Sequence, residues 1–211
     1  MTGACASQRT EIEVFWGEIA PCDHLVQIYT DDTAFLDSLA GFVSGGLKVG
    51  EAVIVIATQS HRSSLDFRLR ALGIDIEAVR RQDLYIPLDA QETLSKFMVN
   101  GWPNDELFRM VVNSVLARAR KNACKVRAFG EMVALLWAAG HNGATVCLEH
   151  FWTQFCKEET FALFCAYPRS GFTKDADASI REICSAHSRV ISAVSPRRTN
   201  APATYAAARA S

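Results

Sequence analysis

The sequence predicts a three-layer α/β/α sandwich built around a mainly parallel central sheet. Apolar runs typical of strands alternate with amphipathic segments typical of helices along most of the 211 residues. The run 52–57 (Ala-Val-Ile-Val-Ile-Ala) is apolar at every position, as expected for a strand covered on both faces. We therefore expect one domain at 21–194, preceded by an N-terminal arm (1–20) and followed by a disordered tail (195–211).

Turn and capping residues separate the expected elements. Strands are predicted at 25–29, 52–57, 84–88, 125–129 and 161–167. Helices are predicted from Asp31 or Asp32 to about Gly45, and then at 60–73, 90–99, 105–119, 131–140, 144–157 and 177–194. Because ligands of parallel sheets bind at the carboxyl ends of the strands, we expect the site among 29–33, 58–62, 88–89, 129–131 and 167–172.

Composition argues against several classes of partner. The formal net charge is −1, which gives no reason to expect nucleic acid or a membrane surface. No apolar run approaches the ~20 residues of a membrane helix, and residues 1–10 lack the apolar core of a signal peptide, so we expect a cytoplasmic protein. The seven cysteines form no CxxC pair and are interpreted as reduced thiols, with no metal and no cofactor expected.

Five short segments together resemble the MEDS family, the methanogen/methylotroph DcmR sensory domain. They are His24-Leu-Val-Gln-Ile-Tyr29, Gly50-Glu51 with the strand after it, Arg127-Ala-Phe-Gly-Glu-Met132 with Trp137, Leu148-Glu149, and Cys165-Ala-Tyr-Pro168. The resemblance covers about 22–172. It implies a sensory domain of prokaryotic signalling proteins, attached in some members to DNA-binding or histidine-kinase modules, with small hydrocarbon derivatives as suggested signals.

The order of elements also resembles the RecA/KaiC-type P-loop ATPase core, but the catalytic positions differ. Thr30-Asp31-Asp32-Thr33 follows the first strand, with no glycines to wrap a phosphate and no Lys-Ser/Thr pair. Gln59 and Ser60 stand where acids are expected after the second strand. We therefore expect a RecA/KaiC-like topology without ATPase machinery, no catalytic residues, and no enzyme activity.

Arg127 and Glu131 flank the Phe-Gly turn and are the leading candidates for a ligand site. A charge between apolar residues is costly unless it is paired or meets a ligand. The two side chains are interpreted either as a ligand clamp at the strand end or as a structural ion pair. The arginine fork would suit a carboxylate or phosphate.

The other candidates each have a structural alternative. His24, His61 and Arg62 flank strands one and two and could contact a ligand or simply support the fold. Glu149 could pair with Arg127 across the core or be exposed, and Cys147 with His150 is a weak metal pair three residues apart. Three aromatic residues complete the predicted ligand set: Tyr29, Trp137 and Tyr167. The alternative is that their side chains belong to the hydrophobic core.

These observations favour a non-catalytic sensory domain that binds a small organic ligand or a partner protein at the carboxyl edge of the sheet. The C-terminal helix is expected to respond to binding, and a separate histidine kinase or transcription regulator would receive the signal, since no such module is recognisable here. A homo-oligomer is possible. The alternatives are an interaction module without a ligand and, less favoured, an enzyme acting on a small molecule or nucleotide.

Overall fold

The computed structural model describes residues 16, 19–123, 125–172 and 176–191. Most of the expected N-terminal arm (1–15 and 17–18) and the whole expected tail (195–211) lie outside these residues. Among the helices in the described part, none is long and apolar enough to cross a membrane.

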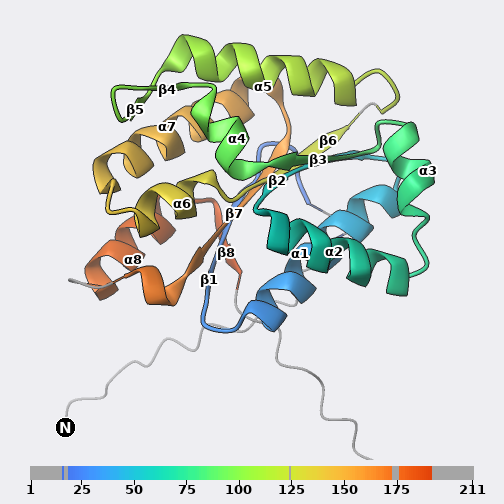
Figure 1. Ribbon diagram of the computed structural model, residues 1–211, viewed down its shortest axis with the longest axis horizontal. Coiled ribbons are helices and arrows are strands. Elements are labelled where there is room, and N and C mark those ends of the chain that lie inside the picture. Colours follow the sequence, from blue (N-terminus) through green and yellow to red (C-terminus); the bar gives the residue numbers. More distant parts are fainter. Residues whose placement is uncertain (1–15, 17–18, 124, 173–175, 192–211) are drawn as a thin grey trace, which may run out of the picture.

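A six-stranded sheet forms the centre of the molecule (Figure 1). Its strands are β1 (His24–Tyr29), β2 (Ala52–Ala57), β3 (Tyr85–Asp89), β6 (Val126–Gly130), β7 (Ala162–Pro168) and β8 (Arg189–Ile191). They lie in the order β3-β2-β6-β7-β1-β8, and every pairing is parallel. A separate antiparallel hairpin joins β4 (Met98–Val99) to β5 (Trp102–Pro103).

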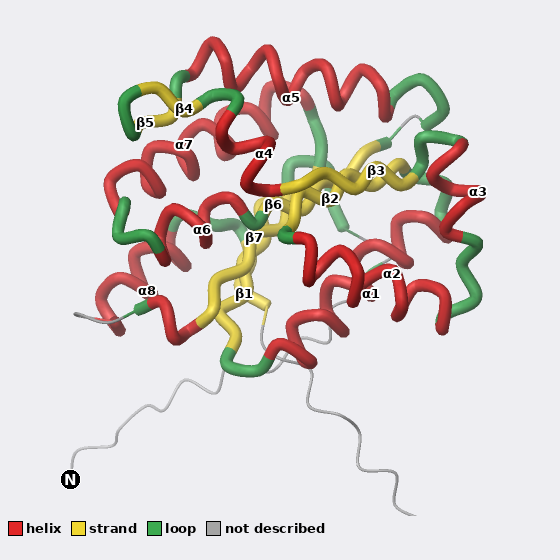
Figure 2. Tube along the Cα trace, viewed as in Figure 1, coloured by secondary structure: helices red, strands yellow, loops and turns green. Residues whose placement is uncertain are grey.

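Helices cover both faces of this sheet, which confirms the three-layer α/β/α prediction (Figure 2). One face, called the α1 face, carries α1 (Asp32–Lys48), α2 (Gln59–Ala71) and α3 (Ile76–Arg81). The opposite face, called the α7 face, carries five helices: α4 (Ala90–Ser95), α5 (Asp105–Ala119), α6 (Met132–Ala138), α7 (Asn142–Glu159) and α8 (Ala176–Ser185). Alternate strand residues therefore enter two separate cores.

Local sequence explains where the main elements begin. All six residues of β2 are buried, as its unbroken apolar run predicted. Asp31 caps α1 by accepting hydrogen bonds from the backbone N–H groups of Thr33 and Ala34. The Asp31 carboxylate thus occupies the helix terminus at which a P-loop would hold a phosphate.

Three segments differ from the sequence-based expectation. The stretch between Gly73 and β3 contains the short helix α3, which was not predicted. The helix expected at 90–99 ends at Ser95 because the chain then turns into the β4–β5 hairpin. The helix expected at 177–194 ends at Ser185, and β8 follows it. Pairing with the open edge of β1 outweighs the helical propensity of this short segment.

Arg127 is buried on the α1 face, where it joins β6 to α1. Its Nε lies 2.6 Å from Glu51 Oε2, and its Nη1 donates to the carbonyls of Trp16 and Phe42 at 2.8 and 3.0 Å. A Cβ atom at Gly46 would lie 2.7 Å from Arg127 Nε, so only glycine leaves room for this side chain. The Trp16 ring also packs against Phe42 and Phe164, which places this part of the expected arm on its own domain.

Candidate functional site

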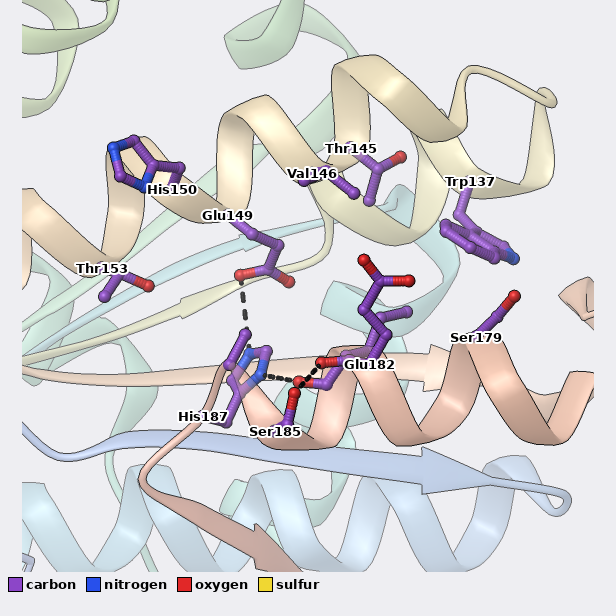
Figure 3. Close-up of a pocket in the computed structure, with 12 residues that line it drawn as sticks. Trp137, Thr145, Val146, Glu149, His150, Thr153, Ser179, Glu182, Ser185 and His187 are labelled. Atoms are coloured by element: carbon purple, nitrogen blue, oxygen red, sulfur yellow. Dashed lines mark hydrogen bonds and ion pairs between the residues drawn. The ribbon is translucent and has the colours of Figure 1, made fainter.

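A cavity of about 370 Å³ opens between α6, α7 and α8 on the α7 face. The α7 side is formed by Thr145, Val146, Glu149, His150 and Thr153 (Figure 3). Trp137 of α6 and the two residues after α8, Ala186 and His187, also line the cavity. The remaining lining residues belong to α8: Ser179, Glu182, Ile183 and Ser185. Its volume lies in the range of small-molecule sites, ~300–1,000 Å³.

Buried polar groups converge at the inner end of this cavity. Glu149 and His187 reach it from the two sides, with Glu149 Oε2 3.5 Å from His187 Nε2 (Figure 3). Behind them, His24 Nε2 lies 3.4 Å from both Glu149 Oε2 and Cys165 Sγ. Tyr167 donates a hydrogen bond from its hydroxyl to the second oxygen of Glu149. We call the four residues His24, Glu149, Cys165 and His187 the polar cluster.

Burial shapes the protonation of this cluster. Burial and the neighbouring His187 lower the pKa of His24 to about 4, so its imidazole is neutral near pH 7. Burial alone would raise the pKa of Glu149, but the His187 and His24 imidazoles and the Tyr167 hydroxyl outweigh it and keep that pKa below its ordinary value. Burial and the adjacent Glu149 raise the pKa of the Cys165 thiol well above its ordinary value. The cluster thus holds a carboxylate beside a neutral imidazole and a thiol.

Aromatic side chains close the cavity toward the sheet. Trp137 is half-buried, and its indole N–H donates to the Gly171 carbonyl at 3.0 Å. Its ring packs near Tyr167 and Phe172, with ring centroids 6.4 and 5.0 Å away. Tyr167 itself is fully buried and acts on the site through its hydroxyl. The result is a small chamber with apolar walls and a polar inner end.

The chain matches the sequence model of one family, described as the MEthanogen/methylotroph, DcmR Sensory domain (MEDS), over residues 23–188. It belongs to the MEDS family. This confirms the resemblance seen in the sequence and gives the chain a sensory role. No curated protein matches it. The matched MEDS segment spans β1 to the residue after His187 and so includes every residue that lines the cavity.

Two of the predicted ligand residues, Trp137 of α6 and Glu149 of α7, line the cavity of this MEDS domain. Two more, His24 of β1 and Tyr167 of β7, contact Glu149 behind it. Their meeting point is the α7 face of the sheet rather than the carboxyl edge that we expected. His24 shows why: it is the first residue of β1, opposite Leu163 in the register, and its side chain points toward α7.

Four other predicted residues, Glu131, His61, Arg62 and Tyr29, lie near the carboxyl ends of the strands, where Glu131 contacts His61 and the other two contact neighbouring residues. Glu131 accepts from the Thr58 N–H and lies 2.8 Å from His61 Nδ1. Arg62 bonds the Ala57 carbonyl and the Asp89 carboxylate, which ties the end of β2 to the end of β3. Tyr29 stacks on Phe35 with ring centroids 4.5 Å apart. These contacts hold the loops of the MEDS domain together at this edge.

The proposed pairing of Arg127 with Glu131 or Glu149 is wrong. Arg127 is the second residue of β6 and Glu131 follows its last, so the two Cα atoms lie roughly 13 Å apart at ~3.3 Å per strand residue. Arg127 faces α1, where Glu51 neutralises it, whereas Glu149 lies on the opposite side of the sheet. Glu149 is buried rather than exposed, and Cys147 is not part of the polar cluster.

The sequence interpretation missed Cys165 and His187. Cys165 lies two residues before Tyr167 on the same strand, so both point to the α7 face, a signal the period-two pattern of β7 contains. His187 was placed inside a helix expected to run to 194. The β-branched Val190-Ile191 pair that follows His187 favours a strand there and so indicates that the helix ends before it.

Proposed function

We propose that this MEDS domain is a non-catalytic sensor that binds a small, uncharged organic molecule in the cavity between α6, α7 and α8. The observation that carries the proposal is the cavity itself, because its size, its apolar walls and its buried polar inner end combine the features of a small-molecule site. Two residues predicted from the sequence, Trp137 and Glu149, line it, which supports the proposal.

The charges around the cavity favour a neutral ligand. Glu149 and Glu182 contribute carboxylates, and the described part of the lining contains no lysine or arginine. An anion would therefore meet repulsion without a compensating cation, and Arg127 is used on the other face of the sheet. A molecule with a short hydrocarbon body and a hydroxyl group satisfies both the Val146 and Ile183 walls and the Glu149–His187 end.

Transmission of the signal is assigned to α8. Ile183 is its buried anchor, whereas Glu182 and Ser185 are exposed even though both line the cavity. Few buried contacts make a helix easy to displace. A ligand that binds one position of α8 more tightly than another shifts the population toward it. We propose that a separate signalling protein, a histidine kinase or a transcription regulator, reads that position.

The test is a thermal-shift series with straight-chain primary alcohols and the carboxylates of matching chain length. A ligand at a hundred times its dissociation constant adds ~2.7 kcal/mol of stability, which raises the melting temperature by roughly 5–10 °C for a domain of this size. We expect a shift with one or more alcohols and none with the carboxylates.

Two variants locate the effect. Val146→Trp places an indole at the cavity wall from a half-exposed position on α7, so it should abolish the shift without unfolding the domain. Met110→Trp makes the same addition on α5, where Met110 is 62% exposed and away from the cavity, and should retain it. A shift that survives Val146→Trp would contradict the proposed site, and no shift with any compound would favour the interaction-module alternative.

A further inference from the structure

The four residues of the polar cluster present one nitrogen, oxygen or sulfur atom each to a common point. His24 Nε2, Glu149 Oε2, Cys165 Sγ and His187 Nε2 all lie within 4.8 Å of one another. Four of the six donor separations are 3.4 Å for His24–Glu149 and for His24–Cys165, 3.5 Å for His187–Glu149, and 3.9 Å for Cys165–Glu149. All four residues are buried.

These four separations are close to those in a tetrahedral zinc site, and the two remaining donor pairs lie within 4.8 Å. Zn–N bonds of ~2.0 Å and Zn–S bonds of ~2.3 Å hold tetrahedral donors roughly 3.3–3.7 Å apart. Two imidazoles, one thiolate and one carboxylate are also the donor types that Zn²⁺ takes in proteins. Small side-chain adjustments would bring the four donors into bonding range.

His187 supplies an independent observation. Its side chain is fully buried, and its Nε2 makes no hydrogen bond in the described structure although Glu149 Oε2 lies 3.5 Å away. His187 Nδ1 lies 2.7 Å from the Ile183 carbonyl, which makes Nδ1 the donor to that carbonyl and turns Nε2 into the cluster. Nε2 and the Glu149 carboxylate oxygen thus face each other without a hydrogen bond, and a cation between them would contact both.

The groups around the cluster hold its donors in the orientation that a metal needs. His24 Nδ1 lies 3.1 Å from Thr153 Oγ1, which orients the ring with Nε2 inward. The Tyr167 hydroxyl binds the other oxygen of Glu149 and leaves Oε2 toward the cluster. Outer partners of this kind commonly fix metal ligands, and removing one typically costs ~10–100-fold in affinity.

We propose that His24, Glu149, Cys165 and His187 form a binding site for a borderline divalent metal ion of the Zn²⁺ class. The Cys165 thiol loses its proton to solvent as the sulfur–metal bond forms, and both histidines bind as neutral rings. The ligands come from β1, α7, β7 and the α8–β8 connection. Such wide separation in the chain explains why ligand spacing gave no signal in the sequence.

Metal binding would connect the C-terminal segment to the core. His187 is the residue through which the α8–β8 connection reaches the cluster, and Glu149 and His187 also line the cavity. The ion would therefore fix the inner end of the cavity and the position of α8 together. The metal site shares Glu149 and His187 with the cavity, but its four donors are complete without the proposed organic ligand.

The test is titration of the chelator-treated full-length chain with Co²⁺, followed by competition with Zn²⁺. Cobalt on a thiolate gives a sulfur-to-metal charge-transfer band in the near ultraviolet, together with visible bands of tetrahedral coordination. We expect saturation at one Co²⁺ per chain and loss of the bands when Zn²⁺ is added. No saturable binding, or cobalt bands without the thiolate signal, would overturn the proposal.

Variants assign the donors. Cys165→Ser should remove the charge-transfer band, His187→Gln should weaken binding by more than ~100-fold, and Thr153→Val should weaken it by ~10–100-fold with the band retained. Cys147→Ser, which removes a partly buried thiol of α7 outside the polar cluster and outside the cavity lining, is the matched control that should bind like the original chain. His187→Gln lies in a connection between elements, so it provides a test even if Cys165→Ser does not fold.

Binding that survives both Cys165→Ser and His187→Gln, or that is lost in Cys147→Ser, would contradict the assignment. The metal test follows cobalt absorbance in the absence of any alcohol. The sensor test follows the alcohol-induced thermal shift and its loss in Val146→Trp. Failure of the metal site is therefore distinguishable from failure of the proposed sensor function.

Discussion

At the scale of single residues, Glu131 determines the charge state of His61. Their side chains lie 2.8 Å apart, and this hydrogen bond raises the pKa of His61 above the ordinary value of 6.5 despite the opposing effect of burial. The charges of Glu131 and Asp32 act in the same direction. Protonated His61 thus favours the folded state, a contribution fully present below pH 6.5 and lost as pH rises through the raised pKa.

We predict that Glu131→Gln lowers the pKa of His61, measured by NMR titration of its ring. The variant should also lose roughly 1–3 kcal/mol of stability in urea denaturation, with the larger loss below pH 6.5, because a hydrogen bond to a charged group is removed. Glu92→Gln, which removes an exposed carboxylate paired with Lys96, is the control and should leave His61 unchanged. An unaltered His61 titration in Glu131→Gln would show that the pair does not set this charge.

At the scale of elements, Arg127 joins β6 to α1 and to Trp16 rather than to a ligand. Its side chain is 1% exposed, and Glu51 is its charged partner. Arg127→Met would leave the Glu51 carboxylate and the Phe42 carbonyl without this donor. Breaking a buried ion pair on one side costs ~3–5 kcal/mol, so we expect a loss of that size in urea denaturation.

Arg118→Met is the matched control, because it removes an arginine whose pair with Asp83 is on the surface of α5. Its side chain is 47% exposed, and the expected change is within ~1 kcal/mol. The alcohol-induced thermal shift should persist in both variants under conditions where they fold. If Arg127→Met kept full stability but lost the ligand, the clamp interpretation would replace the structural one.

The sequence predicted elements whose signals are local. The apolar run of β2 and the cap at Asp31 each depend on neighbouring residues, and the structure confirms both. β8 has three residues, and its stability comes from pairing with β1, about 160 positions earlier in the chain. Local propensity does not record such a partner, and the predicted helix therefore ran through it.

The same limit applies to the site. Trp137, Glu149 and Tyr167 were predicted as ligand residues at the carboxyl edge of the sheet, whereas the structure places them near one another on the α7 face. The face to which Glu149 points depends on how α7 packs, and its partners come from β1, β7 and the α8–β8 connection. His187 joins the group through tertiary packing, whereas the period-two pattern of β7 places Cys165 on the same face as Tyr167 but does not identify its partners.

At the scale of the whole molecule, the sheet separates two tasks. The α1 face holds Trp16 and the buried Arg127–Glu51 pair, and its residues support the fold. The α7 face holds the cavity, the polar cluster and α8. If a ligand binds as proposed, one face of the MEDS domain would change while the other keeps the sheet intact.

Methyl NMR of the full chain during titration with a short primary alcohol tests the sensor account most directly. The account predicts that the largest shifts occur at Val146 and Ile183, which line the cavity, with small shifts at Val53 and Leu65 on the α1 face. Shifts concentrated on the α1 face, or no saturable shift at any methyl group, would contradict a ligand site between α7 and α8.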